Sequence, residues 1–234
     1  MSATLATEPV APSPGPHAAT WTGSPHVAAF RPLERQATTL DFERNDEIFA
    51  QDEPAQYCYL VLSGCVRTVT LIEDGRRQVG EFLLPGDLFG CDSLAEHDFS
   101  AEAVTQVVVR RYCRRALESL ADSSRELART LRELSANQLR AARERMIMLG
   151  RKTASERIAG FLVEMSERGA VDAHGRIELP MSRTDVADHL GLTIETVCRG
   201  LSELHRVGTI AVNRGTVAIR NRRALDSAGI KIVH

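Results

Sequence analysis

Four side chains in the C-terminal part of the sequence have the types and spacing needed to contact DNA bases. Glu195, Cys198, Arg199 and Ser202 are separated by three, one and three residues, which places them on one face of a helix. An arginine can donate two hydrogen bonds to guanine O6 and N7, and a glutamate can accept from the amino group of cytosine or adenine, each contact discriminating by roughly 1–3 kcal/mol. Seen alone, a Glu/Arg pair four residues apart is also typical of a solvated salt bridge, so the flanking residues must decide.

The flanking residues have the pattern of two helices joined by a tight turn. Ser182 and Asp185 form a capping-box-like pair at the start of the first helix, and Thr193 is a suitable cap for the second. Gly191 lies at the turn, where a positive φ is expected. The pattern predicts a helix-turn-helix over residues 182–204, whose second helix enters the major groove. The residues expected to pack inward are Val186, Ala187, Leu190, Leu192, Val197, Leu201 and Leu204.

Backbone phosphates are the expected partners of the residues around the reading helix. Ser182, Arg183 and Thr184 stand at the start of the first helix, where a phosphate can be held. Two short apolar stretches flank Asn213-Arg214-Gly215, which predicts a β-hairpin wing with Arg214 at its tip. The segment is therefore expected to be a winged helix. Its predicted DNA-binding residues are Ser182, Arg183, Thr184, Thr193, Glu195, Cys198, Arg199, Ser202 and Arg214.

The N-terminal half has the pattern of short antiparallel strands. Segments rich in Val, Leu, Tyr, Phe and Thr occupy residues 56–62, 66–72, 77–84 and 104–112, and turn signals such as Asp74-Gly75 separate them. We expect a β-barrel domain over residues 29–113. Residues 1–28 are rich in Ala, Pro, Ser and Thr without periodicity, so we expect a disordered tail there.

A helical region links the barrel to the predicted winged helix. Residues 114–149 contain no Pro or Gly and are predicted to form mostly one long helix, within a segment 114–150. Its apolar stripe could pack on its own domain or pair across a homodimer, and we favour the homodimer. A second amphipathic helix over 153–168 and a strand near 177–179 then begin a DNA-binding domain spanning 151–234. The fold class is α+β. The stripe consists of Leu120, Leu127, Leu131, Leu134, Ala142, Met146 and Leu149.

Composition agrees with this organisation without deciding the function. Residues 151–234 hold 13 lysines and arginines against 10 acidic residues, whereas the rest of the chain is acidic, so the C-terminal part is better suited to a polyanion. The five cysteines lack any C-x-x-C pair, which argues against a disulfide framework or a zinc site. No apolar run approaches the ~20 residues that span a bilayer, and no basic-then-apolar leader is present. We expect a cytoplasmic protein without a membrane partner.

The order of barrel, long helix and winged helix resembles the Crp/Fnr family of bacterial regulators over residues 30–234. The resemblance rests on Tyr59-Leu-Val-Leu-Ser-Gly64, Phe82-Leu-Leu-Pro-Gly-Asp-Leu-Phe-Gly90 and Thr153-Ala-Ser-Glu-Arg-Ile-Ala-Gly-Phe-Leu162. The segment 181–199 looks most similar to the FixK/Fnr branch, in which a Glu-x-x-Ser-Arg pattern reads half-sites of the type TTGAT. Matching that pattern here gives Glu195, Cys198 and Arg199. Cys198 departs from the branch's serine and is a weaker hydrogen-bond donor, and Gly200 replaces a larger residue at about 1 kcal/mol of helix propensity.

The resemblance also bears on effectors. Cyclic-nucleotide-binding relatives have a Gly-Glu-Leu turn and an Arg-Ser pair that grips the phosphate; here Cys91 stands at the Glu position and Phe99 at the Arg position. Without that arginine a buried phosphate would lack its countercharge, so we predict no cAMP binding. Iron–sulfur relatives carry a cysteine cluster in the N-terminal tail, but no cysteine precedes Cys58. A different cluster of strand cysteines is the weaker alternative, because such residues are usually small apolar core residues. We expect neither a cofactor nor a metal.

The resemblance implies a homodimeric, FixK-like transcription regulator that is not an enzyme. We expect an activator that binds a TTGAT-N4-ATCAA-like palindrome in double-stranded DNA, contacts RNA polymerase, and controls oxygen-limited metabolism or nitrogen fixation. The alternative is a regulator of the same family gated by an unidentified small effector in the barrel. Cys198 is a candidate redox site because it lies near a helix N-terminus and beside Arg199. A cysteine that merely tolerates a serine position is the competing interpretation.

Overall fold

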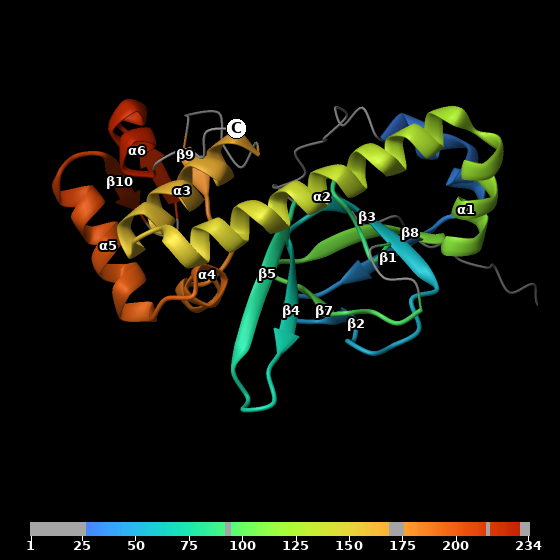
Figure 1. Ribbon diagram of the computed structural model, residues 1–234, viewed down its shortest axis with the longest axis horizontal. Helices are drawn as coiled ribbons and strands as arrows, with labels where there is room; N and C mark the ends of the chain where they lie inside the picture. The colour runs from blue at the N-terminus through green and yellow to red at the C-terminus, as the bar shows by residue number, and fades with distance from the viewer. Residues whose placement is uncertain (1–26, 92–94, 169–175, 214–215, 230–234) are drawn as a thin grey trace, which may run out of the picture.

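The computed structural model describes residues 27–91, 95–168, 176–213 and 216–229. The chain forms a β domain, a long helix that leaves it, and a smaller α/β unit at the other end of that helix (Figure 1). The α+β fold class predicted from the sequence is confirmed. No helix in the described ranges is both long and apolar enough to cross a bilayer.

The β domain consists of two four-stranded antiparallel sheets that enclose an apolar core. Their orders are β1-β8-β3-β6 and β2-β7-β4-β5. The inner side chains include an aromatic group in which Phe49, Tyr59 and Phe89 lie within 6.0 Å of one another by ring centroids. The strands are β1 (Thr38–Phe42), β2 (Glu47–Phe49), β3 (Tyr57–Ser63), β4 (Val66–Leu71), β5 (Arg77–Leu83), β6 (Leu88–Phe89), β7 (Ser100–Ala103) and β8 (Val107–Cys113).

The four strands predicted from the sequence correspond to β3, β4, β5 and β8. The β4–β5 hairpin turns at Asp74-Gly75 as expected, with Gly75 at φ 83° and the Ile72 N–H donating to Arg76 O at 2.9 Å. Strands β1, β2, β6 and β7 were not predicted, because each is at most five residues long and has no clear alternation of polar and apolar side chains. A 3₁₀ segment, η1 (Val27–Gln36), precedes β1 and buries Phe30 and Leu33.

The helical region predicted over 114–149, mostly as one long helix, consists of the short helix α1 (Arg114–Ser123) and the long helix α2 (Arg125–Arg151). Ser124 separates them in an extended conformation (φ −109°, ψ 105°), and its hydroxyl accepts from the Leu127 N–H at 3.3 Å. Serine favours this local bond over helix continuation, and nothing else in the sequence marks the break. In Figure 1, α2 runs from the β domain to the C-terminal unit.

The apolar stripe of α2 divides into two parts. At its N-terminal end Leu127 is buried and Leu131 half-buried, both against the β domain and η1. Farther along, Ala142 and Met146 are exposed, and so are Leu139 and Ile147 beside them. The first turns of the stripe therefore pack on the β domain and its last residue, Leu149, is half-buried at the Gly191 turn, whereas the stretch between them includes exposed apolar side chains.

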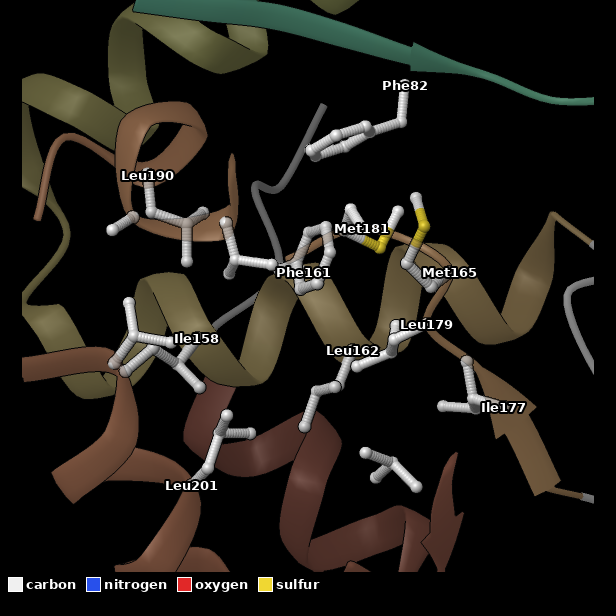
Figure 2. Packing of buried hydrophobic residues seen from close by; sticks show 14 of the residues in the cluster. Phe82, Ile158, Phe161, Leu162, Met165, Ile177, Leu179, Met181, Leu190 and Leu201 are labelled. Carbon is white, nitrogen blue, oxygen red and sulfur yellow. The ribbon is translucent and has the colours of Figure 1, made fainter. Parts of the chain in front are cut away.

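The C-terminal unit packs three helices and a small sheet around α3. Its Ile158, Phe161, Leu162 and Met165 are all buried, as the amphipathic pattern predicted. The same apolar cluster continues into the β domain through Val79 and Phe82, so the two units share a core (Figure 2). The elements are α3 (Ala154–Glu167), β9 (Arg176–Glu178), α4 (Arg183–Leu190), α5 (Ile194–Arg206), β10 (Ile210–Asn213), β11 (Thr216–Ile219) and α6 (Arg222–Gly229), with sheet order β10-β11-β9.

Candidate nucleic-acid interface

Helices α4 and α5 form the predicted helix-turn-helix, and their local contacts agree with the sequence pattern. Ser182 caps α4 in a full capping box: its hydroxyl accepts from the Asp185 N–H at 3.0 Å, and the Asp185 carboxylate accepts from the Ser182 N–H at 3.0 Å. Gly191 ends α4 in the left-handed conformation at φ 61°. Thr193 caps α5 by accepting from the Thr196 N–H at 3.2 Å. These contacts fix where α5 begins relative to α4.

The turn between the two helices is also supported from below by α2 and α3. A Cβ on Gly191 would lie 3.1 Å from Leu149 Cδ2, so α2 closes on the turn where only glycine fits easily. Arg157 of α3 donates to Leu190 O at 2.9 Å and to Leu149 O at 2.8 Å. One guanidinium therefore joins the end of α4 to the last turns of α2, a contact that the sequence did not indicate.

Glycine at position 200 also has a packing reason. A Cβ there would approach Ile158 Cδ1 to 2.4 Å, and Ile158 is 2% exposed in the core of α3. The departure from the family's larger residue therefore permits α3 and α5 to cross closely. The close packing of α5 on Ile158 therefore offsets the helix propensity that Gly200 loses relative to a larger residue.

The four residues of the predicted reading face, Glu195, Cys198, Arg199 and Ser202, are all exposed on α5. Hydrogen bonds from the backbone N–H of Glu195 and from the Thr193 hydroxyl hold the pKa of the Glu195 carboxyl below its usual range, so it is an acceptor at neutral pH. The Ser202 hydroxyl donates to Cys198 O at 2.8 Å, which leaves its lone pairs for a partner. Within the described ranges no ion pair joins Glu195 to Arg199, so both side chains are available to bases.

The residues predicted to hold phosphates are less uniformly available. Thr184 is exposed and Arg183 half-buried at the start of α4. The Ser182 hydroxyl, by contrast, donates to Asp185 Oδ2 at 2.7 Å and is committed to the cap. Strands β10 and β11 form the predicted wing hairpin, with Asn213 paired to Thr216. Arg214 at its tip lies outside the described residues.

The remaining cysteines, Cys58, Cys65, Cys91 and Cys113, differ in their burial and surroundings in the β domain. Cys58 lies in the core beneath η1, and Cys65 lies in the cluster shared with the C-terminal unit, where burial raises the pKa of its thiol to about 12. Cys91 is half-buried and Cys113 exposed. Within the described ranges no group of three or more histidine, cysteine or acidic side chains is arranged to hold a metal ion.

Sequence reasoning missed the polar contacts that cross between the β4–β5 hairpin and α4. Nitrogen atoms of Arg67 and Arg77 lie 2.9 and 2.8 Å from Asp185 Oδ1.

The buried position of His189 was missed as well. Its ring lies between those of Phe82 and Phe161, at centroid distances of 5.1 and 5.7 Å. Burial, followed by the charge of Arg145, lowers the pKa of His189 to about 3, so its ring is neutral and its Nδ1 can accept from Arg145 at 3.0 Å. No short-range pattern marks partners that are more than a hundred residues apart.

Comparison with known proteins identifies both units. Residues 39–124 match the cyclic nucleotide-binding domain and residues 156–228 match the Crp-like helix-turn-helix domain. The chain is 46% identical to the nitrogen fixation regulation protein FixK of Azorhizobium caulinodans over 80% of this chain and 77% of that protein. It is 35% identical to the transcriptional activator protein FnrL of Cereibacter sphaeroides, over 84% of this chain and 83% of that protein.

A solved structure agrees with these relatives. The structure of FixK2 from Bradyrhizobium japonicum is 43% identical, covers 84% of this chain and 99% of that chain, and superposes with a TM-score of 0.80. The chain therefore belongs to the Crp/Fnr family of DNA-binding transcription regulators, in which it is similar to FixK, and it is not an enzyme.

Proposed function

We propose that this regulator binds a TTGAT-N4-ATCAA-like palindrome as a homodimer and activates transcription. The observation that carries the proposal is the open face of α5, where Glu195, Cys198 and Arg199 stand exposed at the spacing of the FixK/Fnr reading pattern. Arg199 is assigned to the guanine of each half-site and Glu195 to a neighbouring amino group. Thr184 and Arg183 are assigned to the phosphates beside them.

The homodimer is proposed from the exposed part of α2. Leu139, Met146 and Ile147 are 53%, 74% and 41% exposed. Met146 and its neighbour Ile147 lie about two helical turns after Leu139 on the same side of α2. Large apolar side chains in a row on a solvent-facing helix favour pairing with a second copy. Two reading helices would then face half-sites about one DNA turn apart.

Control of oxygen-limited metabolism, with nitrogen fixation among its outputs, is proposed from the relatives. The relative from Azorhizobium caulinodans is named a nitrogen fixation regulation protein, and that from Cereibacter sphaeroides a transcriptional activator. Activation implies a contact with RNA polymerase when the protein is bound near a promoter.

Fluorescence anisotropy and sedimentation test the proposal together. We expect the purified full chain to bind a duplex with the TTGAT-N4-ATCAA sequence far more tightly than one with the same bases scrambled, with two chains per duplex. Specific sites are typically bound about 10³-fold or more above nonspecific DNA at physiological salt. Equal affinity for both duplexes, or one chain per duplex, would contradict it.

We infer that the barrel does not serve cyclic nucleotides, so DNA binding needs no cAMP. Phe99 stands at the position of the phosphate-gripping arginine and packs on Phe49 at a centroid distance of 5.9 Å. Ser100 beside it accepts from the Gln51 N–H at 2.9 Å. We expect isothermal titration with cAMP to give no measurable heat and the DNA affinity to be the same with and without it. Tight binding or a cAMP-dependent rise in DNA affinity would contradict the inference.

The alternative expected from the sequence is a small effector bound in the barrel, but the cavity that the structure shows lies elsewhere. A groove of about 350 Å³ lies between α2, α3 and α6, lined by residues that include Arg145, Met148 and Glu164. This groove is outside the barrel. A metabolite that raises both the melting temperature and the DNA affinity of the protein would favour this alternative.

We propose Cys198 as a redox control point on the reading face. Its thiol is exposed beside Arg199, and oxidation to a sulfinate would place a negative charge against DNA. We expect peroxide to weaken DNA binding by the parent protein and to leave a Cys198→Ser protein unaffected, as measured by anisotropy before and after treatment. Cys113→Ser is the control, because Cys113 is also exposed but lies at the end of β8. Equal peroxide sensitivity of the Cys198→Ser protein would show that position 198 merely tolerates a cysteine.

A further inference from the structure

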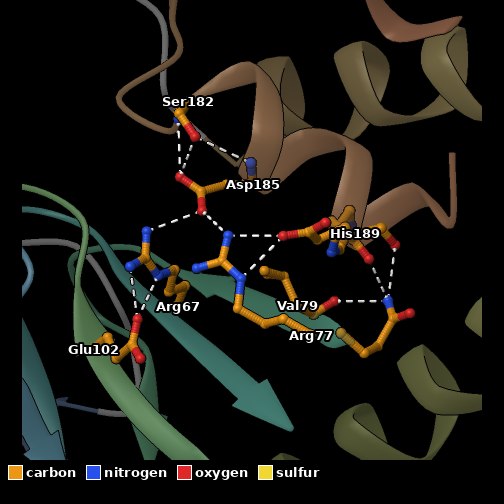
Figure 3. A network of polar contacts seen from close by, with 9 residues as sticks. Arg67, Arg77, Val79, Glu102, Ser182, Asp185 and His189 are labelled. Atoms are coloured by element: carbon orange, nitrogen blue, oxygen red, sulfur yellow. Dashed lines mark hydrogen bonds and ion pairs between the residues drawn. The ribbon is translucent and has the colours of Figure 1, made fainter. Parts of the chain in front are cut away.

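The boundary between the β4–β5 hairpin and α4 contains charged side chains that are largely removed from water. Arg67 and Asp185 have side chains 10% and 3% exposed, and their Nη1 and Oδ1 atoms are 2.9 Å apart. Arg77 lies beside them, 2.8 Å from the same Oδ1 and 2.7 Å from Asp188 Oδ2. Figure 3 shows the two arginines converging from the hairpin on the first turn of α4. We call Arg67, Arg77, Asp185 and Asp188 the docking network.

Asp185 links two roles through its two carboxylate oxygens. Oδ2 accepts from the Ser182 N–H and hydroxyl and so completes the cap of α4. Oδ1 accepts from Arg67 and Arg77 of the hairpin. A displacement of the hairpin therefore acts directly on the residue that fixes the start of the helix-turn-helix.

Arg67 is itself held in place on the β domain, and further polar contacts cross the boundary beside the network. Arg67 lies at a register shift between β4 and β5, and its Nε donates to Glu102 Oε2 of β7 at 2.8 Å. Gln78, next to Arg77, donates to Asp188 O at 2.6 Å. At the end of α3, Arg168 donates to Phe82 O at 2.8 Å and pairs with Asp87. Polar contacts thus cross the boundary at several points.

The docked arrangement leaves the reading face open. Helix α4 lies between the hairpin and α5 (Figure 1), and the docking network joins α4 to the hairpin (Figure 3). The reading residues Glu195, Cys198 and Arg199 remain exposed. The contacts therefore hold the helix-turn-helix without covering it, which is the arrangement expected of a DNA-competent state.

Buried ion pairs restrict the relative orientation of the groups they join more than they add to net stability. Desolvation offsets most of their attraction, but their geometry penalises any orientation that separates the charges. The apolar contacts at the same boundary, such as Phe82 with Phe161, are far less directional. The charged groups therefore constrain the angle between the two units in addition to the apolar core that the units share.

We propose that Arg67 and Arg77 are positioning residues for DNA recognition, which act through Asp185 and Asp188 to hold α5 at the angle a palindrome requires. The proposal rests on the proposed function, because two reading helices must meet two half-sites at once. A single half-site makes no such demand on the angle. Loss of the network therefore weakens palindrome binding and spares half-site binding.

The test compares Arg77→Glu with Arg76→Glu in the full chain. Arg76 lies in the same hairpin and carries the same charge, and among the described residues its guanidinium pairs only with Asp74 at the exposed tip. We expect Arg77→Glu to lower palindrome affinity about tenfold more than Arg76→Glu does, the size of a typical coupling between sites. Half-site affinity should fall equally in the two variants. The Arg77→Glu protein should also discriminate less against a palindrome whose spacer is one base pair longer.

Exchanging the charges at positions 77 and 188 distinguishes a role in positioning α5 from a general effect on the stability of the fold. Adding Asp188→Arg to Arg77→Glu restores an opposite-charge pair between positions 77 and 188 but leaves an acid facing Asp185. We therefore expect the exchange to recover part of the palindrome affinity and spacing discrimination. Equal losses on palindrome and half-site, or no recovery in the exchanged protein, would overturn the proposal. Arg77→Gln, a milder change, serves with the same expected direction where circular dichroism shows that Arg77→Glu is unfolded.

Binding by the wild-type protein in the same assay shows whether a failure concerns the docking network or the proposed dimeric function. A wild-type protein that does not prefer the palindrome over a half-site contradicts the dimeric function. In that event small-angle X-ray scattering tests, without DNA, whether the docking network fixes the arrangement of the two units. A larger radius of gyration for the Arg77→Glu protein than for the Arg76→Glu protein supports this role, and equal radii overturn it.

Discussion

Replacing Arg199 with alanine is expected to lower affinity for the palindrome by at least about 30-fold, because a contact worth roughly 1–3 kcal/mol is lost in each of two half-sites. Arg199 is exposed on α5 and makes no ion pair with Glu195, so the variant should fold normally. Anisotropy titration with the TTGAT-N4-ATCAA duplex measures the loss. The contact is made only in the complex, and its removal therefore affects binding rather than stability.

Base substitution shows whether the lost contact is specific. Changing the guanine of both half-sites should weaken the parent protein strongly and leave the Arg199→Ala protein nearly unchanged. Arg223→Ala is the charge-matched control, since Arg223 is exposed on α6, away from the reading face. If Arg199→Ala still discriminated against the altered base, Arg199 would not be the residue that reads it.

The second large effect is expected at Asp185, where Asp185→Asn should lower the free energy of unfolding by about 3 kcal/mol at neutral pH. The substitution removes the charge that Arg67 and Arg77 share and leaves two cations facing a neutral amide. Urea denaturation at a fixed protein concentration measures the change. Asp188→Asn is the matched control. The Asp188 carboxylate is more exposed and, within the part of the chain that the structure describes, pairs with Arg77 alone, so its loss should cost less than about 1 kcal/mol.

The stability difference at Asp185 should depend on pH in a defined direction. Burial opposes ionisation of the carboxyl, but hydrogen bonds from Ser182 and the charges of Arg67 and Arg77 outweigh it and lower its pKa. A group with a depressed folded-state pKa contributes its full stability above the unfolded value of about 3.9 and loses it as the pH falls through the folded value. The parent and Asp185→Asn proteins should therefore converge in stability below about pH 4. A constant difference down to pH 2 would show that the charge of Asp185 is not the cause.

Local features of the reading unit were predictable because their determinants lie close together in the chain. The capping box of Ser182 and Asp185, the positive φ of Gly191 and the cap at Thr193 each depend on residues within three or four positions. The same is true of the Asp74-Gly75 turn. The exposed face of α5 could be predicted because it consists of the residues that remain once the apolar positions are assigned to the core.

Features that depend on distant residues were not predictable. Asp185 has the sequence signature of a cap alone, whereas its second role requires Arg67, 118 residues away. The burial of His189 depends on Phe82 of the hairpin and on Phe161 of α3. Gly200 has an unfavourable helix propensity until Ile158 is placed beneath it. In each case the contacting residue lies on another helix or strand, whose position in space a sequence pattern does not define.

Selection from a random DNA library by the purified full chain shows which sequence the protein reads and whether it reads it as a dimer. We expect enrichment of a palindrome with TTGAT-type half-sites separated by about one helical turn. With the Arg199→Ala protein, we expect that the guanine of each half-site is no longer selected. Enrichment of a single unpaired half-site, or of a palindrome whose guanine is retained by Arg199→Ala, would contradict the assignment of a dimer that reads DNA through Glu195, Cys198 and Arg199.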